Sequence, residues 1–114
     1  MPTFADWAPT VDVAEVNGTY VVKTECPGVE AKDLHVRMEN DVLTIEGEKK
    51  ADFDEKTDRT WRRERMFGSF AREIRFPTST DGTGVKARLV NGVLTLTVPK
   101  AAVAKASSIP IQAG

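Results

Sequence analysis

The fold of this chain is decided by one stretch, Ala87-Arg88-Leu89-Val90-Asn91-Gly92-Val93-Leu94-Thr95-Leu96-Thr97-Val98-Pro99. Two alternating runs flank Asn91-Gly92. Because Asn and Gly both tolerate the positive φ that a type I′ turn requires, the stretch predicts a tight β-hairpin. Pro99 cannot donate to a ladder, so it closes the second arm. The residues that share the core-facing parity of the two arms are apolar: Ala87, Leu89, Leu94, Leu96 and Val98.

Similar alternating segments occur along the rest of the chain, with two-residue turns at Asn17-Gly18 and Asn40-Asp41. Besides the hairpin, which occupies 85–99, the predicted strands are 10–16, 19–25, 34–39, 42–48 and 70–76. Short strands joined by close turns are typical of an antiparallel sandwich. We therefore predict an all-β fold, an immunoglobulin-like antiparallel β-sandwich.

The composition fits one soluble domain: the chain has 114 residues, of which 40% are hydrophobic and 29% charged. The formal net charge of −1 argues against general nucleic-acid binding, which depends on excess positive charge. No apolar run is long enough to insert into a membrane, and residues 1–7 lack the pattern of a signal peptide. The single cysteine, Cys26, cannot form an internal disulfide, so we expect a reducing, cytoplasmic setting.

The residue types that carry catalysis are scarce. His35 and Cys26 are each the only residue of their type, and the sequence offers no Ser-His-Asp, Cys-His or two-His metal constellation. It also has no Gly-rich phosphate loop. We therefore predict that the protein is not an enzyme and uses no metal or cofactor.

A charged loop is predicted over 49–59, with Phe53 as its one large apolar residue. The next segment, Thr60-Trp61-Arg62-Arg63-Glu64-Arg65, is strand-like but highly charged. A strand of this kind fits the edge of a sheet, or a strand that pairs with another chain.

Arg72 shares its parity with Phe70, Ile74 and Phe76 in the predicted strand 70–76. An unpaired charge on an apolar face is expensive to bury. Arg72 is therefore interpreted either as an edge arginine that extends to solvent or as a member of an ion pair across a subunit contact. We favour the second interpretation.

The two ends carry apolar residues outside any periodic run. Phe4 and Trp7 in residues 1–9 belong either to a frayed terminus with one ring docked on the sheet or to the remnant of a longer hydrophobic arm. In the tail, Pro110 favours extended backbone and places Ile109 and Ile111 on one side. The predicted organisation is an arm remnant (1–9), the sandwich domain (10–100) and a C-terminal extension (101–114).

Several segments resemble, in order, those of a bacterial-type small heat-shock protein with its α-crystallin domain. The resemblance covers roughly Trp7 to Ile111 and is carried by these segments: Trp7-x-Pro9-x-Val11-Asp12-Val13, Cys26-Pro27-Gly28-Val29 followed by Asp33-Leu34, Leu43-Thr44-Ile45-x-Gly47-Glu48, Phe70-x-Arg72-x-Ile74-x-Phe76-Pro77, the hairpin from Ala87 to Pro99, and Ile109-Pro110-Ile111.

The resemblance implies an ATP-independent holdase that binds unfolding client proteins and prevents their aggregation. It also implies a homodimer in which the segment 60–65 pairs with the partner's entry strand, 10–15. The implied dimer contacts are Thr60, Trp61, Arg62, Arg63, Glu64, Arg72, Val11 and Val13.

The same resemblance implies that the tail joins neighbouring dimers. Its anchor, Ile109, Pro110 and Ile111, would insert into an apolar groove between the strand 34–39 and the first arm of the hairpin, a mode of extended-peptide recognition. The implied groove residues are Leu34, Val36, Ala87 and Leu89. Family members usually carry a longer hydrophobic N-terminal arm. Because this chain begins almost at the domain, by truncation or naturally, we expect dimers or small assemblies with weakened client protection.

Other classes of function explain less of the sequence. A CS-domain co-chaperone is a related sandwich, but it lacks the exchanged strand and the I-x-I tail. A carbohydrate-binding sandwich would use Trp7 and Trp61 as platforms, yet the two lie in dissimilar contexts without Asn/Asp clusters. A metal site through His35 and Cys26 has no complete ligand set.

Overall fold

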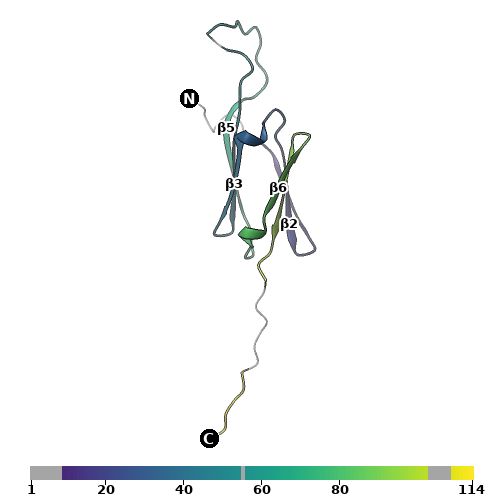
Figure 1. The fold of residues 1–114 in the computed structure, drawn as a ribbon, viewed down its shortest axis with the longest axis vertical. Helices are drawn as coiled ribbons and strands as arrows, with labels where there is room; N and C mark the ends of the chain where they lie inside the picture. Colours follow the sequence, from purple (N-terminus) through teal and green to yellow (C-terminus); the bar gives the residue numbers. More distant parts are fainter. Residues whose placement is uncertain (1–8, 55, 103–108) are drawn as a thin grey trace.

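A computed structural model describes residues 9–54, 56–102 and 109–114. Seven strands and two short 3-10 turns make up its regular structure (Figure 1). They are β1 (Val11–Val16), β2 (Thr19–Glu25), η1 (Ala31–Asp33), β3 (Leu34–Glu39), β4 (Val42–Lys49), β5 (Gly68–Arg75), η2 (Gly82–Gly84), β6 (Lys86–Val90) and β7 (Val93–Pro99). The predicted strands outside the 49–65 region are confirmed, with ends that differ by no more than two residues.

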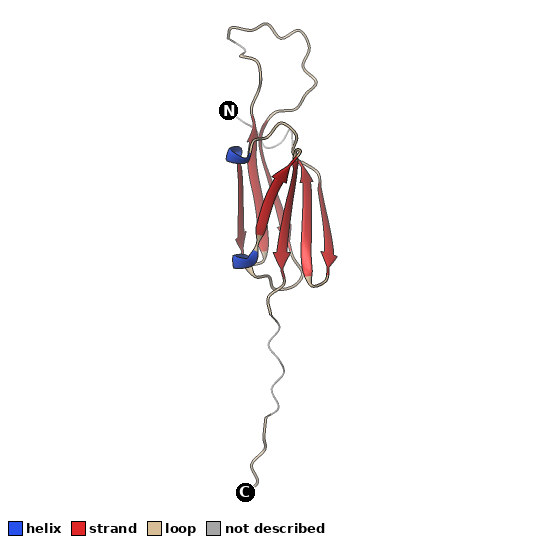
Figure 2. Ribbon diagram, turned by 45° about the vertical axis from the view of Figure 1, so that its right-hand side comes forward, coloured by secondary structure: helices blue, strands red, loops and turns tan. Residues whose placement is uncertain are grey.

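The strands form two antiparallel sheets that pack face to face as a sandwich (Figure 2). One sheet has the order β1-β2-β7-β6 and the other the order β3-β4-β5. The predicted all-β antiparallel sandwich is therefore confirmed. Four strands, β1, β6, β3 and β5, are edges in this arrangement, and each pairs on one side with a strand of its own sheet.

All three two-residue turns have positive φ at both central positions. The φ values are 50° and 78° at Asn17-Gly18, 51° and 62° at Asn40-Asp41, and 51° and 77° at Asn91-Gly92. This geometry is that of type I′ turns, whose twist matches the twist of the flanking strands. Of these six positions with left-handed backbone, five are Asn or Gly, and the sixth is Asp41.

The core lies between the two sheets and consists of alternate residues on the inner strands. Val22, Leu43, Ile45, Leu96 and Val98 have no exposed surface. Packing is tight at Gly47, where an added Cβ would lie 2.5 Å from the ring of Phe70, which is buried on the facing β5. A glycine at this position leaves the space that the Phe70 ring occupies beside the strand.

Candidate functional site

The described residues contain no cluster that resembles a catalytic or metal centre. No group of three or more His, Cys, Asp or Glu side chains in this part of the chain is placed to hold a metal ion. Burial raises the pKa of the Cys26 thiol, an effect that a hydrogen bond with the backbone of Leu94 partly opposes. A buried thiol with a raised pKa is a poor nucleophile. Within the described residues, no helix is long and apolar enough to cross a bilayer.

The candidate functional features are instead the strand edges, the long loop and the tail, where large apolar side chains are exposed. The exposed large apolar residues are Val13, Val16, Phe53, Trp61, Met66, Phe67, Val90, Ile109 and Ile111. These residues lie on β1, on the loop between β4 and β5, at the end of β6 and in the tail.

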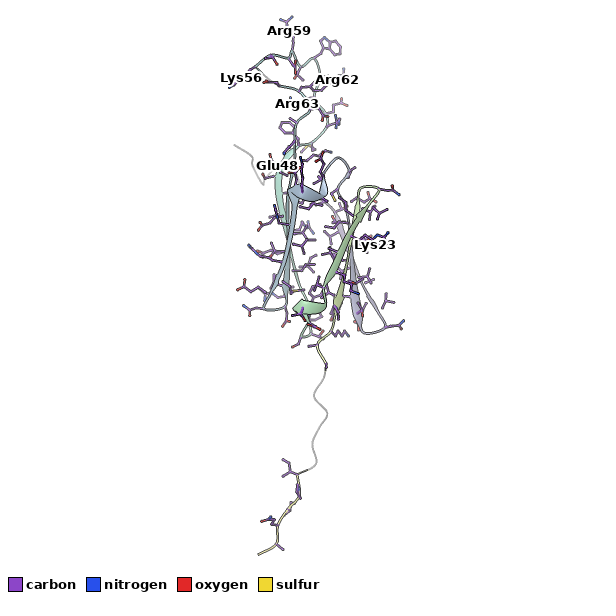
Figure 3. The ribbon with its side chains drawn as sticks, viewed as in Figure 1. Lys23, Glu48, Lys56, Arg59, Arg62 and Arg63 are labelled. Carbon is purple, nitrogen blue, oxygen red and sulfur yellow. The ribbon has the colours of Figure 1, made fainter. Side chains whose placement is uncertain are left out.

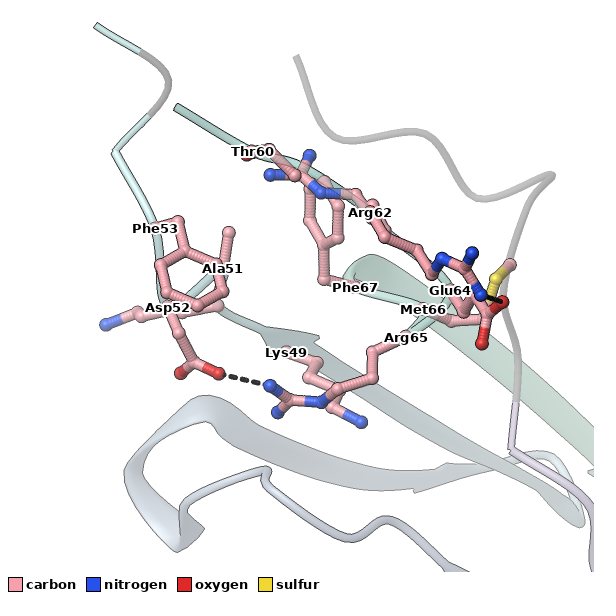
Figure 4. Close-up of a pocket in the computed structure, with 12 residues that line it drawn as sticks. Lys49, Ala51, Asp52, Phe53, Thr60, Arg62, Glu64, Arg65, Met66 and Phe67 are labelled. Atoms are coloured by element: carbon pink, nitrogen blue, oxygen red, sulfur yellow. Dashed lines mark hydrogen bonds and ion pairs between the residues drawn. The ribbon is translucent and has the colours of Figure 1, made fainter. Parts of the chain in front are cut away.

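The long loop, residues 50–67, extends from one end of the sandwich (Figure 1). Its two sides enclose a cavity of about 260 Å³, with an apolar lining from Ala51, Phe53, Met66 and Phe67 and a basic rim (Figure 4). Ion pairs join residues of the loop to one another: Arg65 to Asp52 at 2.6 Å and Arg62 to Glu64 at 3.6 Å. All four of these charged side chains are more than half exposed, so the loop is closed by weak surface pairs.

The predicted strand 60–65 belongs to neither sheet in this structure of a single chain. A strand is maintained by a ladder of backbone hydrogen bonds, and the described segment lies away from every sheet edge of its own chain, on the side of the loop that returns to β5 (Figure 3). Trp61 is 89% exposed there, with the guanidinium of Arg62 5.8 Å from its ring centroid. Figure 3 shows Lys56, Arg59, Arg62 and Arg63 gathered in the same region, so the loop presents aromatic and basic groups outward.

The predicted acceptor of this segment, β1, is an uncovered edge. Val11 and Val13 pair with residues of β2 on the core-facing side of the sheet. Val11 is half-buried against the core, but Val13 is 45% exposed, which means that nothing in the described chain covers the inner face of β1 at that point. The strand also carries two exposed carboxylates, Asp12 and Glu15.

Arg72 lies on β5 between Phe70 and Ile74, on the inward parity that the sequence predicts. It is half-buried and lies opposite the fully buried Ile45 on β4. No carboxylate of the described residues forms an ion pair with it. An arginine in this position has its stem packed against apolar neighbours and its charge available to another group.

The predicted groove residues lie along two edge strands of different sheets. Leu34 and Val36 on β3 and Leu89 on β6 are half-buried. Ala87 shares the core-facing side with its partner Leu96, yet it is exposed because β6 is an edge and no strand of the opposite sheet covers it. Ala87 thus has the core-facing parity that the sequence indicates, but it is not buried.

Two further apolar residues extend the same surface. Met38 on β3 and Val85, just before β6, pack against the core together with Leu34, Val36 and Leu89. The side chain of Met38 also lies close to Gly82, since a Cβ built there would be 3.5 Å from its Cγ. Extending the alternation by one step in each strand would have identified both residues from the sequence.

The proposed anchor is fully available in this structure. Ile109 is 83% exposed and Ile111 95% exposed, with Pro110 between them also exposed. Exposing two isoleucine side chains to water is unfavourable. Binding of the tail to an apolar surface that buries both side chains is therefore favoured by their transfer free energy. The predicted roles of Phe4 and Trp7 fall outside the described residues.

Comparison with known proteins gives a consistent family match. The Hsp20/alpha crystallin family model matches residues 12–112. Small heat shock protein C2 of Rickettsia felis is 35% identical over 104 residues, which cover 91% of this chain and 68% of that protein. Spore protein SP21 of Stigmatella aurantiaca is 39% identical over 94 residues, which cover 82% of this chain and 56% of that protein. The chain thus spans between 56% and 68% of the length of these two relatives.

Solved structures with the same fold include a small heat-shock protein from Xylella fastidiosa and HspA from Xanthomonas axonopodis. A protein from Xylella fastidiosa aligns with a TM-score of 0.81 and 34% identity, over 96% of this chain and 100% of that chain. HspA from Xanthomonas axonopodis aligns with a TM-score of 0.74 and 38% identity, over 84% of this chain and 96% of that chain.

Proposed function

Because the chain belongs to the Hsp20/alpha crystallin family, we propose that it is an ATP-independent holdase, which binds unfolding proteins and prevents their aggregation. The family consists of small heat shock chaperones and not of enzymes, and its members form dimers and oligomers. The observation that carries the proposal is the distribution of exposed apolar side chains. They lie on strand edges, the loop and the tail, where an unfolded segment can be bound without a shaped pocket.

The proposed dimer forms by strand exchange. In it, Thr60, Trp61, Arg62, Arg63 and Glu64 leave the loop and pair with β1 of the partner, next to Val11 and Val13. Charge supports the pairing, since residues 59–65 contain four arginines and one glutamate, whereas β1 carries Asp12 together with Glu15, which also pairs with Lys100 of its own chain. Geometry supports it too, because β1 is a sheet edge that pairs with β2 alone, and a strand added at that edge would place side chains beside the exposed Val13.

Arg72 is proposed as a further group at the dimer contact. Its half-buried side chain has no carboxylate partner among the described residues of its own chain, so a partner's carboxylate would complete an ion pair. A partly desolvated pair of this kind discriminates between correct and incorrect partners more than it adds affinity.

Assembly beyond the dimer is proposed to use the anchor Ile109-Pro110-Ile111 and the groove formed by Leu34, Val36, Ala87 and Leu89, extended by Met38 and Val85. Burying two isoleucines contributes roughly 3–6 kcal/mol before ordering costs are subtracted. A single anchor is therefore weak and reversible. Several anchors in one assembly hold together by avidity and still permit subunit exchange.

We keep the proposed organisation of an arm remnant (1–9), an α-crystallin domain (10–100) and an extension (101–114). A reducing, cytoplasmic location fits the single, buried Cys26. A CS-domain co-chaperone is not favoured, because the family model and the relatives are those of small heat shock proteins.

The holdase proposal is tested by aggregation suppression. Citrate synthase is heated with and without this protein in the absence of nucleotide, and turbidity is followed with serum albumin at equal mass as the control. A decrease in turbidity that depends on the chaperone-to-client ratio is expected. Unchanged turbidity at an excess of this chain over citrate synthase would contradict holdase activity.

A further inference from the structure

The root of the C-terminal tail is held in place by backbone hydrogen bonds on both of its sides. On one side, Lys100 N–H donates to the carbonyl of Gly18 in the β1–β2 turn at 3.3 Å. On the other side, Ala101 N–H donates to the carbonyl of Ser79 at 2.9 Å, and Asp81 N–H donates to the carbonyl of Pro99 at 2.9 Å. Past Pro99, where β7 ends, Lys100 forms an isolated antiparallel bridge with Thr80, so the chain runs between a turn of one sheet and the segment 78–81.

The side chain of Lys100 connects the tail root to β1 and β2 by contacting one residue of each strand. Its ammonium forms an ion pair with Glu15 and lies 5.4 Å from the ring centroid of Tyr20. The hydrogen bond with Glu15 raises the pKa of Lys100. Tyr20 is itself buried, and its hydroxyl is 2.7 Å from the hydroxyl oxygen of Thr78 in a hydrogen bond. The Tyr20 side chain thus contacts Lys100 at the tail root through its ring and Thr78 of the segment 78–81 through its hydroxyl.

Asp41 attaches the segment 78–81 to the opposite sheet. Its carboxylate accepts hydrogen bonds from the backbone N–H of Thr80 at 2.8 Å and from the Thr80 hydroxyl at 3.0 Å, and its carbonyl accepts one from Phe76 N–H at 3.0 Å. This residue occupies the turn position that Gly18 and Gly92 occupy in the other two hairpins, at a φ of 62°. Glycine would adopt that backbone with less strain, so the aspartate is explained by what its side chain binds.

We propose that Lys100 and Asp41 are positioning residues that fix where the tail leaves the sandwich and in which direction its anchor is presented. We call the set formed by Lys100, Ala101, the segment 78–81 and Asp41 the tail-root clamp. This inference rests on the proposed anchor function of Ile109 and Ile111. Only seven residues, 102–108, separate the clamp from Ile109, which limits the anchor to roughly 25 Å from a fixed point.

A fixed starting point has a direct consequence for assembly. If the tail could pivot freely from β7, the anchor would sample grooves in every direction, and many of those geometries would not close into a defined assembly. A clamped root restricts the anchor to grooves within reach of that end of the sandwich. The effective concentration of the anchor at a correctly placed groove is then higher.

The clamp itself is tested by amide hydrogen exchange on the full chain, measured by NMR. The amides of Lys100 and Ala101 should be protected, and the amide of Ala113 should exchange freely. In Asp41→Gly, which keeps a turn-compatible residue and deletes only the carboxylate, protection at Ala101 should decrease about tenfold. Lys100→Met, which keeps an aliphatic stem, should decrease it several-fold, and Lys23→Met on the exposed face of β2 is the matched control. Equal protection at Ala101 in the parent chain, Asp41→Gly and Lys100→Met would overturn the inference.

Assembly then separates this inference from the anchor itself. By light scattering, Asp41→Gly and Lys100→Met should require several-fold higher protein concentration for assembly beyond the dimer, while Lys23→Met behaves as the parent chain. The double variant Ile109→Ser/Ile111→Ser should lose that assembly but keep the protection of Ala101. If the double variant assembles normally, the anchor role fails. If it loses assembly while Asp41→Gly and Lys100→Met assemble like the parent chain, the positioning role fails.

Discussion

The long loop and the tail root lie at opposite ends of the sandwich, and the chain holds them by different means (Figure 1). The ion pairs Asp52–Arg65 and Arg62–Glu64 join loop residues to one another and are exposed. The tail root is joined instead to both sheets, through backbone hydrogen bonds and through Asp41 and Lys100. This difference suits two different tasks, since a segment that must leave its own chain should be weakly held, whereas the starting point of an anchor should be fixed.

The largest expected effect comes from removing the loop segment. Deleting residues 53–61 should convert the dimer to monomers, because at least about 3 kcal/mol of strand pairing is lost, which is a factor of about 100 or more in the dissociation constant. Analytical ultracentrifugation over a concentration series measures this. Circular dichroism and thermal unfolding provide the control that the sandwich remains folded. A deletion variant that still forms dimers with the parent affinity would rule out strand exchange.

A second large effect is expected at the other end of the molecule. Ile109→Ser/Ile111→Ser should abolish assembly beyond the dimer, since it removes most of the roughly 3–6 kcal/mol of gross burial assigned to the anchor. The dimer itself should be unaffected, because the loop and β1 are intact. Gln112→Ser/Ala113→Ser, at the next two positions of the exposed tail, is the matched control. Light scattering that gives the same mass for both double variants would contradict the anchor role.

The weak contacts of the long loop and the stronger contacts of the tail root should contribute differently to the free energy of unfolding. Asp41→Gly should lower the free energy of unfolding by about 1–2 kcal/mol, because it removes two hydrogen bonds to a carboxylate while relieving some backbone strain. Arg65→Met, which breaks the exposed pair with Asp52, should change it by less than about 0.5 kcal/mol. Urea denaturation measures both. Equal effects in the two variants would remove the distinction between a weakly held loop and a fixed tail root.

The smallest effect expected is a pH dependence at the tail root. The pKa of Lys100 is raised by Glu15 in the folded protein, so folding favours the charged form, and its contribution to stability is fully present below the ordinary lysine pKa of 10.5. That contribution is lost as the pH increases through the folded-state pKa. The difference in unfolding free energy between the parent chain and Lys100→Met should therefore shrink above pH 10.5. Cys26 is present in both proteins, so its own titration cancels when the two unfolding free energies are subtracted. An unfolding free-energy difference that increases with pH would contradict this prediction.

Most of the sandwich could be predicted from short-range patterns. Alternation with period two located the strands, and Asn-Gly or Asn-Asp pairs located the type I′ turns. The resemblance of ordered motifs added the family, which the family model then confirmed. These features depend on residues a few positions apart, so each strand or turn can be predicted from its own segment of the sequence.

The segment 60–65 and Ala87 show where such patterns fail. Residues 60–65 are predicted as a strand, but a strand also needs a ladder partner, and the described chain supplies none at that position. Ala87 has the parity of a core residue, but its exposure depends on whether a strand of the other sheet lies above it. Parity identifies the side of a sheet on which a residue lies, whereas coverage of that side is a property of the packed layers.

The sequence by itself thus determined the strands, the hairpins, the inward faces and the family, because period-two alternation and turn chemistry act within each segment. Only the tertiary structure brought Asp41 to Thr80, across 39 positions of the chain, and Lys100 to Glu15, across 85 positions. No local pattern links residues so far apart, since their contact depends on how the two sheets are stacked. The difference between a loosely held loop and a fixed tail root is a consequence of that stacking.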